Sequence, residues 1–288
     1  MIEGQCGFFT SLACRSALLR GQAHFPGCLC LSRPPLSDPL LQDVNLIRKV
    51  AKFANGVLDV AFPASCVSCG EMVDGTALPH VCDRCFSKIH IVEDPRCLTC
   101  GYPFFGEVES HGDCQHCSRL TPRFARGWSV CLFRGPIRDL VYALKYQSSM
   151  WALDDLARIA EYAEGLDEFL EDAILVPVPL HPRKLRERGY NQSALITEEL
   201  GRRFRCATAI NLLRRIVDTP SQTQFNRKER YRNLRNAFSL SANRSVEPSR
   251  RYVVVDDVFT TGSTLNACAS VLRKSGAKQV DVLTIGHG

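Results

Sequence analysis

The chain has 288 residues, of which 45% are hydrophobic and 23% are charged, and its formal net charge is +6. This composition is typical of a globular protein of about two domains, and no apolar run approaches the roughly 18 to 20 residues that a membrane span needs. Glu3, Cys14 and Arg15 also disrupt a signal-peptide pattern, so we expect a cytoplasmic protein with no membrane span. The positive charge suits an anionic ligand, either a phosphate-rich metabolite or nucleic acid, although an ordinary solvated surface would also produce it.

The N-terminal region divides into two parts. Residues 1–44 keep no helical or strand period, and Pro34, Pro35 and Pro39 interrupt them, so we expect a poorly structured extension. Residues 45–61 place apolar side chains at helical spacing, with basic and polar side chains on the other face. This pattern predicts an amphipathic helix, which we expect to dock on a neighbouring domain rather than on a membrane.

Residues 62–120 contain four Cys-x-x-Cys pairs in two sets with nearly the same spacing. The first set is Cys66, Cys69, Cys82 and Cys85, and the second is Cys97, Cys100, Cys114 and Cys117. In a secreted miniprotein such a density of cysteines would indicate disulfides, but the paired spacing favours metal binding in a reducing compartment. Four thiolates close a tetrahedral site, which is the structural arrangement for Zn²⁺, and the metal supplies folding energy to a segment with little apolar bulk.

The sequence therefore predicts a double zinc ribbon with two structural Zn²⁺ sites. Crossed pairing of the two sets, an iron–sulfur cluster and redox-active dithiols are the alternatives. Histidines near the pairs offer a further source of ligands, which eight cysteines make unnecessary: His80, His90, His111 and His116.

From residue 127 to residue 288, apolar strands alternate with amphipathic helices. Strands are predicted at 130–133, 173–178, 252–256 and 280–285, and helices at 136–146, 153–166, 193–204 and 265–275. Such alternation is typical of the α/β class with a mostly parallel, doubly wound sheet.

The stretch Val253–Leu265 is the most informative part of this domain. A β-branched strand leads into Asp256 and Asp257, and a turn follows in which a helix begins. The turn consists of Thr260, Thr261, Gly262, Ser263 and Thr264. A helix N-terminus attracts phosphate through free amides and its dipole, glycine permits close approach, and hydroxyl groups add donors. The two acids lie where they can accept hydrogen bonds from two adjacent ribose hydroxyl groups.

This stretch resembles the signature of type I phosphoribosyltransferases, which is a hydrophobic strand, two acids and a Thr-Thr-Gly-x-Thr loop. The resemblance implies a type I phosphoribosyltransferase fold. It also implies that Asp256 and Asp257 hold the 2′ and 3′ hydroxyl groups of phosphoribosyl pyrophosphate, while the loop amides hold its 5′-phosphate.

Two basic segments accompany this loop. The first, Val176–Gln192, follows a strand, and open α/β sheets bind ligands at that end of their strands. Its cations suit pyrophosphate oxygens: Arg183, Lys184, Arg186 and Arg188. The second, Thr219–Phe238, is a candidate mobile lid, or else a solvated basic helix.

Together with the cysteine pairs and Leu144–Tyr146, these segments resemble the ComF/GntX family from about residue 46 onward. The specific matches are Arg186–Gln192 (RERGYNQ) and Asp256–Thr264 (DDVFTTGST). The family implies a zinc-ribbon region before a phosphoribosyltransferase-like domain. It further implies a link to DNA uptake during natural competence in some bacteria, or to sugar-acid utilisation by older naming, and neither role follows from the residues themselves.

Three functions follow as hypotheses. In the first, the protein transfers phosphoribosyl to an acceptor that the sequence does not identify, while Mg²⁺ and the cations stabilise the leaving pyrophosphate. The expected catalytic residues are Asp256, Asp257, Arg183 and Lys184. The expected ligand-binding residues are the turn Thr260–Thr264, Arg188 and Lys145.

In the second hypothesis, the protein is a non-catalytic adaptor for single-stranded DNA or for the DNA-uptake machinery, and the arginine-rich segments follow phosphates. Base stacking would need aromatic residues beside those arginines, and the sequence offers only a few, Tyr190, Phe225 and Tyr231. In the third, the protein senses phosphoribosyl pyrophosphate without turning it over. An oligomer is possible in all three cases.

Overall fold

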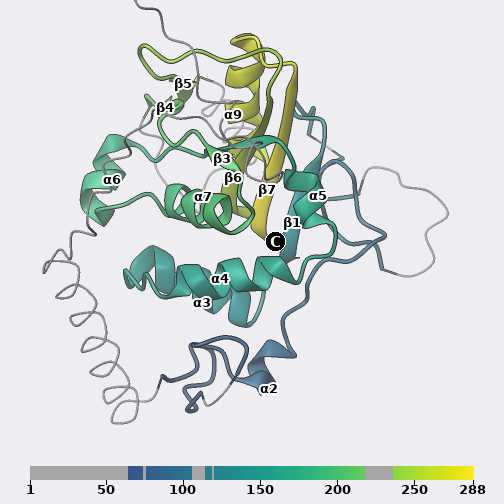
Figure 1. The fold of residues 1–288 in the computed structure, drawn as a ribbon, viewed down its shortest axis with the longest axis vertical. Coiled ribbons are helices and arrows are strands. Elements are labelled where there is room, and N and C mark those ends of the chain that lie inside the picture. The colour runs from purple at the N-terminus through teal and green to yellow at the C-terminus, as the bar shows by residue number, and fades with distance from the viewer. Residues whose placement is uncertain (1–63, 74–75, 106–113, 119, 218–235) are drawn as a thin grey trace, which may run out of the picture. The chain divides into compact units, whose positions relative to one another are not determined.

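The structure is a computed structural model that describes residues 64–73, 76–105, 114–118, 120–217 and 236–288 (Figure 1). The expected extension at 1–44, the expected helix at 45–61 and residues 218–235 of the second basic segment lie outside the described residues. Within the described ranges, no helix is both long and apolar enough to cross a membrane.

A five-stranded parallel sheet organises the C-terminal part, with the strand order β1-β7-β6-β2-β3 (Figure 1). The strands are β1 (Gly127–Leu132), β2 (Ala173–Pro177), β3 (Ala207–Thr208), β6 (Arg251–Phe259) and β7 (Gln279–His287). Strands β6 and β7 are almost entirely buried and apolar in sequence, as expected for central strands of a parallel sheet covered on both faces.

Helices cover both faces of the sheet. Val253 and Val255 of β6 belong to a core with α3 (Pro136–Tyr146), α4 (Ala152–Glu161) and α7 (Gln192–Arg203). Val254 belongs to a second core with α9 (Ser263–Lys274). Successive strand residues point to opposite faces, so the continuous apolar run of β6 supplies both cores. The predicted α/β class with a mostly parallel, doubly wound sheet is confirmed.

Five shorter elements complete the described part. They are α2 (Asp83–Phe86), α5 (Leu166–Leu170), α6 (Pro182–Arg188), β4 (Leu213–Arg215) and β5 (Phe238–Leu240), of which β4 and β5 pair antiparallel. Helix α6 was not among the predicted elements, and its first turn is capped by the His181 side chain accepting from the Arg183 backbone N–H.

Several predicted elements differ from the structure in their bounds. The strand expected at 130–133 begins at Gly127. The helix expected at 153–166 ends at Glu161 as α4, and the separate helix α5 begins after Gly165, which adopts a left-handed conformation with φ of 80°. The strand expected at 252–256 continues to Phe259, because β7 keeps pairing with it as far as Val258↔Gly286 and Phe259↔His287. The two acids therefore lie within the strand, near its C-terminal end, and not after it.

The two cysteine sets join different cores. Cys66, Cys82 and Cys85 belong to the core that includes α3 and α4. Cys97, Cys100, Cys114 and Cys117 belong to the core that includes α9. In both sets the glycine after the first pair, Gly70 or Gly101, is left-handed and closes a tight turn by donating back to the first cysteine.

Candidate functional site

The loop between β6 and α9 depends on Gly262. This residue caps α9 with φ of 68°, and a Cβ there would lie 2.5 Å from Cζ of Phe259 and 3.0 Å from Cδ2 of Leu120. No larger residue fits without a shift of its neighbours. Thr260 is exposed and Ser263 is buried, while the Thr261 and Ser263 hydroxyl oxygens lie 2.9 Å apart. The loop thus offers hydroxyl groups and the free amides of the first helical turn at one place.

Asp256 and Asp257 each meet a partner from a different helix. Ser193, at the start of α7, donates from Oγ to Oδ1 of Asp256 at 2.8 Å. Lys145, in the last turn of α3, forms an ion pair with Oδ2 of Asp257. Loss of water around the carboxyl group, followed by the charge of Asp257, raises the pKa of Asp256 to about 7. Asp257 is therefore paired with a cation, while Asp256 titrates near neutral pH.

The motif Arg186–Gln192 and the serine after it hold this site together. Tyr190 donates from its hydroxyl group to the Leu144 carbonyl oxygen on α3. Asn191 donates from Nδ2 to the carbonyl oxygen of Val178, just after β2, at 3.0 Å. Sequence reasoning missed Ser193, Tyr190 and Asn191 as parts of the site. The available signal was their position in a polar motif directly after a strand.

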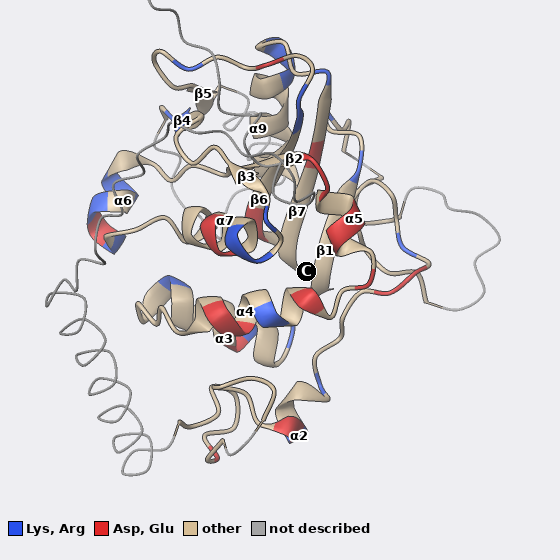
Figure 2. Ribbon diagram, viewed as in Figure 1, with Lys and Arg blue, Asp and Glu red and all other residues tan. Residues whose placement is uncertain are grey.

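The predicted cations fall into two groups. Lys145 reaches the acids, as described above. Arg183, Lys184 and Arg188 lie on α6, where Arg183 pairs with Glu187 (Nε–Oε1 3.5 Å) and Arg188 donates to the Gln192 side chain. Figure 2 shows α6 as a concentration of basic residues. Contact between α6 and a bound pyrophosphate stays a prediction.

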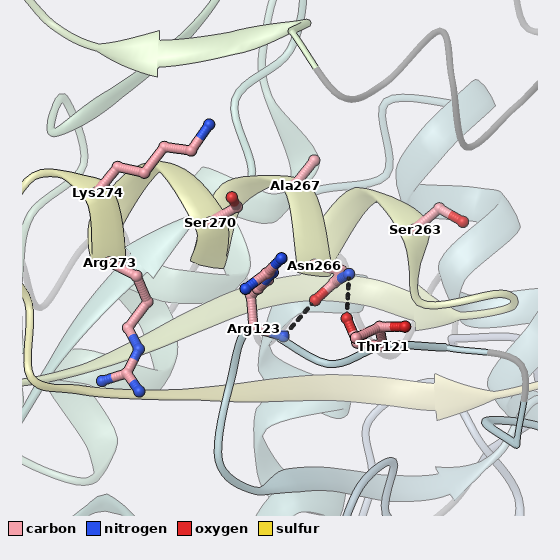
Figure 3. A pocket seen from close by; sticks show the side chains of 8 residues that line it. All are labelled: Thr121, Arg123, Ser263, Asn266, Ala267, Ser270, Arg273 and Lys274. Carbon is pink, nitrogen blue, oxygen red and sulfur yellow. Dashed lines mark hydrogen bonds between the residues drawn. The ribbon is translucent and has the colours of Figure 1, made fainter.

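A cavity of about 470 Å³ runs along the outer face of α9 and shares Ser263 with the loop (Figure 3). Arg123, Arg273 and Lys274 also line it. At its inner wall, Asn266 accepts from the Arg123 backbone N–H at 2.6 Å and donates to the Thr121 carbonyl oxygen at 3.0 Å. The Asn266 side chain therefore joins the segment that leaves the second cysteine set to the first turns of α9.

The cysteines form the two clusters that the spacing predicted. In each set of four, all sulfur atoms lie within 4.8 Å of one another. In the second cluster, the Cys97–Cys117, Cys100–Cys114 and Cys114–Cys117 sulfur distances are 3.5, 3.2 and 3.6 Å. Tetrahedral zinc with bonds of about 2.3 Å places its sulfur atoms about 3.8 Å apart, so both donor type and spacing fit Zn²⁺.

Two observations separate thiolates and histidines in these clusters. The pKa of Cys97 is lowered to about 4, chiefly by a hydrogen bond from Cys100, although burial acts in the opposite direction. The lowered pKa favours the thiolate form, which is the form that binds zinc. His80 is engaged elsewhere, since it bonds Asp155 through Nδ1 at 3.1 Å and stacks on Trp151. Among the described residues, neither cluster includes a histidine.

Known proteins match this chain both in its cysteine-rich segment and over most of its length. Residues 57–118 match the family model of the double zinc ribbon domain. Competence protein F of Haemophilus influenzae is 30% identical over 215 residues, covering 70% of this chain and 94% of that protein. DNA utilization protein YhgH of Escherichia coli is 33% identical over 215 residues, covering 72% and 90%. Competence protein ComFC of Bacillus subtilis is 24% identical over 214 residues, covering 71% and 83%.

Partial likenesses also exist among solved structures. A hypoxanthine phosphoribosyltransferase from Staphylococcus aureus is 12% identical with a TM-score of 0.30, and the match covers 46% of this chain and 61% of that one. An adenine phosphoribosyltransferase from Thermoanaerobacter pseudethanolicus is 15% identical with a TM-score of 0.29, covering 56% and 91%.

Proposed function

This chain belongs to the ComF family, and from that premise we propose that its β6–α9 loop binds phosphoribosyl pyrophosphate together with Mg²⁺ and transfers the phosphoribosyl group to an acceptor. The observation that carries the proposal is the meeting of four features: a carboxylate pair, a lysine, a hydroxyl-rich turn and a helix N-terminus. Gly262 supports it further, because only a residue without a Cβ fits beside the Phe259 ring in the left-handed turn that leads the loop amides into α9.

In this proposal the residues of the chain orient the sugar. Asp256 and Asp257 accept hydrogen bonds from the ribose hydroxyl groups, and the ion pair with Lys145 holds the Asp257 carboxylate in place. The loop amides hold the 5′-phosphate. The bond between C1 and the pyrophosphate oxygen breaks, a bond from the acceptor to C1 forms, and the acceptor loses its proton. Mg²⁺, when bound, neutralises charge on the departing pyrophosphate, and the carboxylates are the oxygen ligands that it favours.

Calorimetry with phosphoribosyl pyrophosphate and Mg²⁺ tests the proposal directly. The wild-type protein is expected to bind, and Asp256→Asn combined with Asp257→Asn is expected to abolish the binding heat. Asp167→Asn, an exposed acid on α5, serves as the control and should leave binding unchanged. Absence of wild-type binding would refute the proposal. Release of pyrophosphate across a set of nitrogen acceptors then tests transfer.

A second candidate function is supported by the names of the relatives, two of which refer to competence and one to DNA utilization. In this version the protein is a non-catalytic adaptor for single-stranded DNA during uptake. The two candidates differ in turnover, because the transferase releases pyrophosphate and the adaptor binds single-stranded DNA without doing so. A protein that binds the strand at physiological salt and shows no turnover with any acceptor would favour the adaptor.

A further inference from the structure

Two tyrosines on α3 are unusually exposed. Tyr142 and Tyr146 lie one helical turn apart, with 54% and 65% of their surface exposed, and their ring centroids are 4.8 Å apart at an interplanar angle of 44°. Among the described residues, no hydrogen bond is recorded for either hydroxyl group. Neighbouring large aromatic rings left in water at this degree of exposure are typical of a binding surface.

The position of these rings follows from the period of the helix. Ile137, Leu140 and Leu144 of α3 are completely buried against the sheet, which leaves Tyr142 and Tyr146 on the outer side. The hydrogen bond from Tyr190 to the Leu144 carbonyl oxygen ties the last turn of α3 to the chain that follows α6. The two rings are therefore presented on a supported helix rather than on a loop.

Cations surround this aromatic pair. The Arg188 guanidinium carbon lies 5.6 Å from the ring centroid of Tyr146, within the range of a cation–π contact. Helix α6 as a whole is strongly basic, with four arginines and lysines, Arg188 included, against the single acid Glu187 (Figure 2). Arg138, one turn before Tyr142 on α3, has 66% of its side chain exposed and lies 3.7 Å (Nε–Oδ1) from Asp139. An apolar protein partner would match the rings but not the net positive charge of α6, whereas a polyanion with flat apolar rings matches both components.

We propose that Tyr142, Tyr146 and Arg188 form a base-stacking surface for single-stranded nucleic acid, whose phosphates pair with the cations of α6. Unpaired bases expose their faces to the tyrosine rings, and each base–aromatic contact tolerates any sequence. In a duplex the same faces are hidden by stacking. The proposal deepens the second candidate function, and the surface is spatially distinct from the ribose site because Lys145 faces Asp257 while Tyr146, the next residue, faces solvent.

The test uses the full chain loaded with zinc and a fluorescein-labelled oligothymidylate, followed by fluorescence anisotropy. Tyr142→Ala combined with Tyr146→Ala is expected to weaken binding by about thirtyfold or more, because stacking is lost at both positions. Tyr142→Phe combined with Tyr146→Phe keeps both rings and is expected to bind within about twofold of wild type. Tyr162→Ala is the matched control, since Tyr162 is 49% exposed but packs on Phe86 away from α6.

Three results would overturn the proposed surface. The first is wild-type affinity for oligothymidylate in the double alanine variant, and the second is a loss of affinity in Tyr162→Ala as large as in that variant. The third is binding of a duplex of the same length as tightly as the single strand. Unchanged melting temperature and zinc content show that the variants fold. If the wild-type protein binds no oligothymidylate at physiological salt, the second candidate function itself fails. If it binds and only the alanine pair is without effect, the function stands and this surface is wrong.

Discussion

Asn266 joins the exit of the second cysteine cluster to α9, and replacing it with alanine should measurably destabilise the protein. The side chain is 3% exposed and makes two hydrogen bonds, from the Arg123 N–H at 2.6 Å and to the Thr121 carbonyl oxygen at 3.0 Å. Asn266→Ala removes both bonds and leaves two backbone groups without that partner. The segment Thr121–Arg123 would then lose its side-chain attachment to the helix that carries the phosphate loop.

The size of the effect follows from these contacts. Each hydrogen bond contributes about 1 kcal/mol net, and a group left unsatisfied can cost up to about 3 kcal/mol. Thr121 and Arg123 are exposed residues, so water can replace part of the loss, and the lower end applies. Alanine also favours the helix by about 0.5 kcal/mol over asparagine. The expected net loss is about 1.5 kcal/mol, or roughly 3 to 6 °C in melting temperature for a domain of this size.

Urea unfolding followed by circular dichroism, in buffer with excess Zn²⁺, measures this loss. Ser270→Ala is the control, because Ser270 lines the same cavity on α9 and makes no recorded side-chain hydrogen bond to a described residue. Its expected effect is within about 0.5 kcal/mol. A loss in Asn266→Ala that does not exceed that of Ser270→Ala would refute the reasoning. As a second readout, the variant should release zinc from the second cluster to a chelator faster than wild type.

Three further predictions follow from the site. Cys100→Ser should increase hydrogen exchange in α9, because the second cluster and α9 belong to the same core. Cys85→Ser in the first cluster should not have this effect, because that cluster belongs to the other core. Equal effects of the two substitutions would contradict the separation of the cores. Gly262→Ala should destabilise more than Gly189→Ala, measured by thermal melting. Both glycines are left-handed and incur about 1 kcal/mol, but only at Gly262 does the added Cβ meet a ring, at 2.5 Å. Asp256→Asn should raise the melting temperature more at pH 8 than at pH 5. The folded pKa of about 7 lies above the reference value of 3.8, so the native state binds more protons than the unfolded chain between these values and loses stability as pH rises; an equal change at both pH values would count against this origin.

The sequence predicted the parts of the site that are local. The β-branched run of β6, the two acids and the glycine-containing turn are contiguous, so strand, loop and helix could be recognised together. The period of α3 likewise placed Ile137 and Leu144 on one side. The break between α4 and α5 was missed because its flanking residues continue the apolar spacing of α4 into α5.

The partners of the acids could not be predicted in the same way. Ser193 and Asp256 are 63 residues apart, and their hydrogen bond exists only because α7 packs on β6. The sequence predicts Lys145 as a phosphate ligand. Its ion pair with Asp257 could not be predicted, because it depends on where α3 ends relative to the sheet. For base stacking, the sequence pointed only to aromatic residues within the basic segments, such as Tyr190. Tyr142 and Tyr146 come from another helix, which reaches α6 only in the folded chain.

The last turn of α3 has an effect beyond holding two side chains. Lys145 and Tyr146 are consecutive, so a rigid rotation of this turn that draws the ammonium group away from Asp257 must also swing the neighbouring ring. A molecule bound on the inner side and one bound on the outer side would then influence each other mechanically without touching. Tyrosine emission from this turn offers a label-free signal for events at the buried carboxylate.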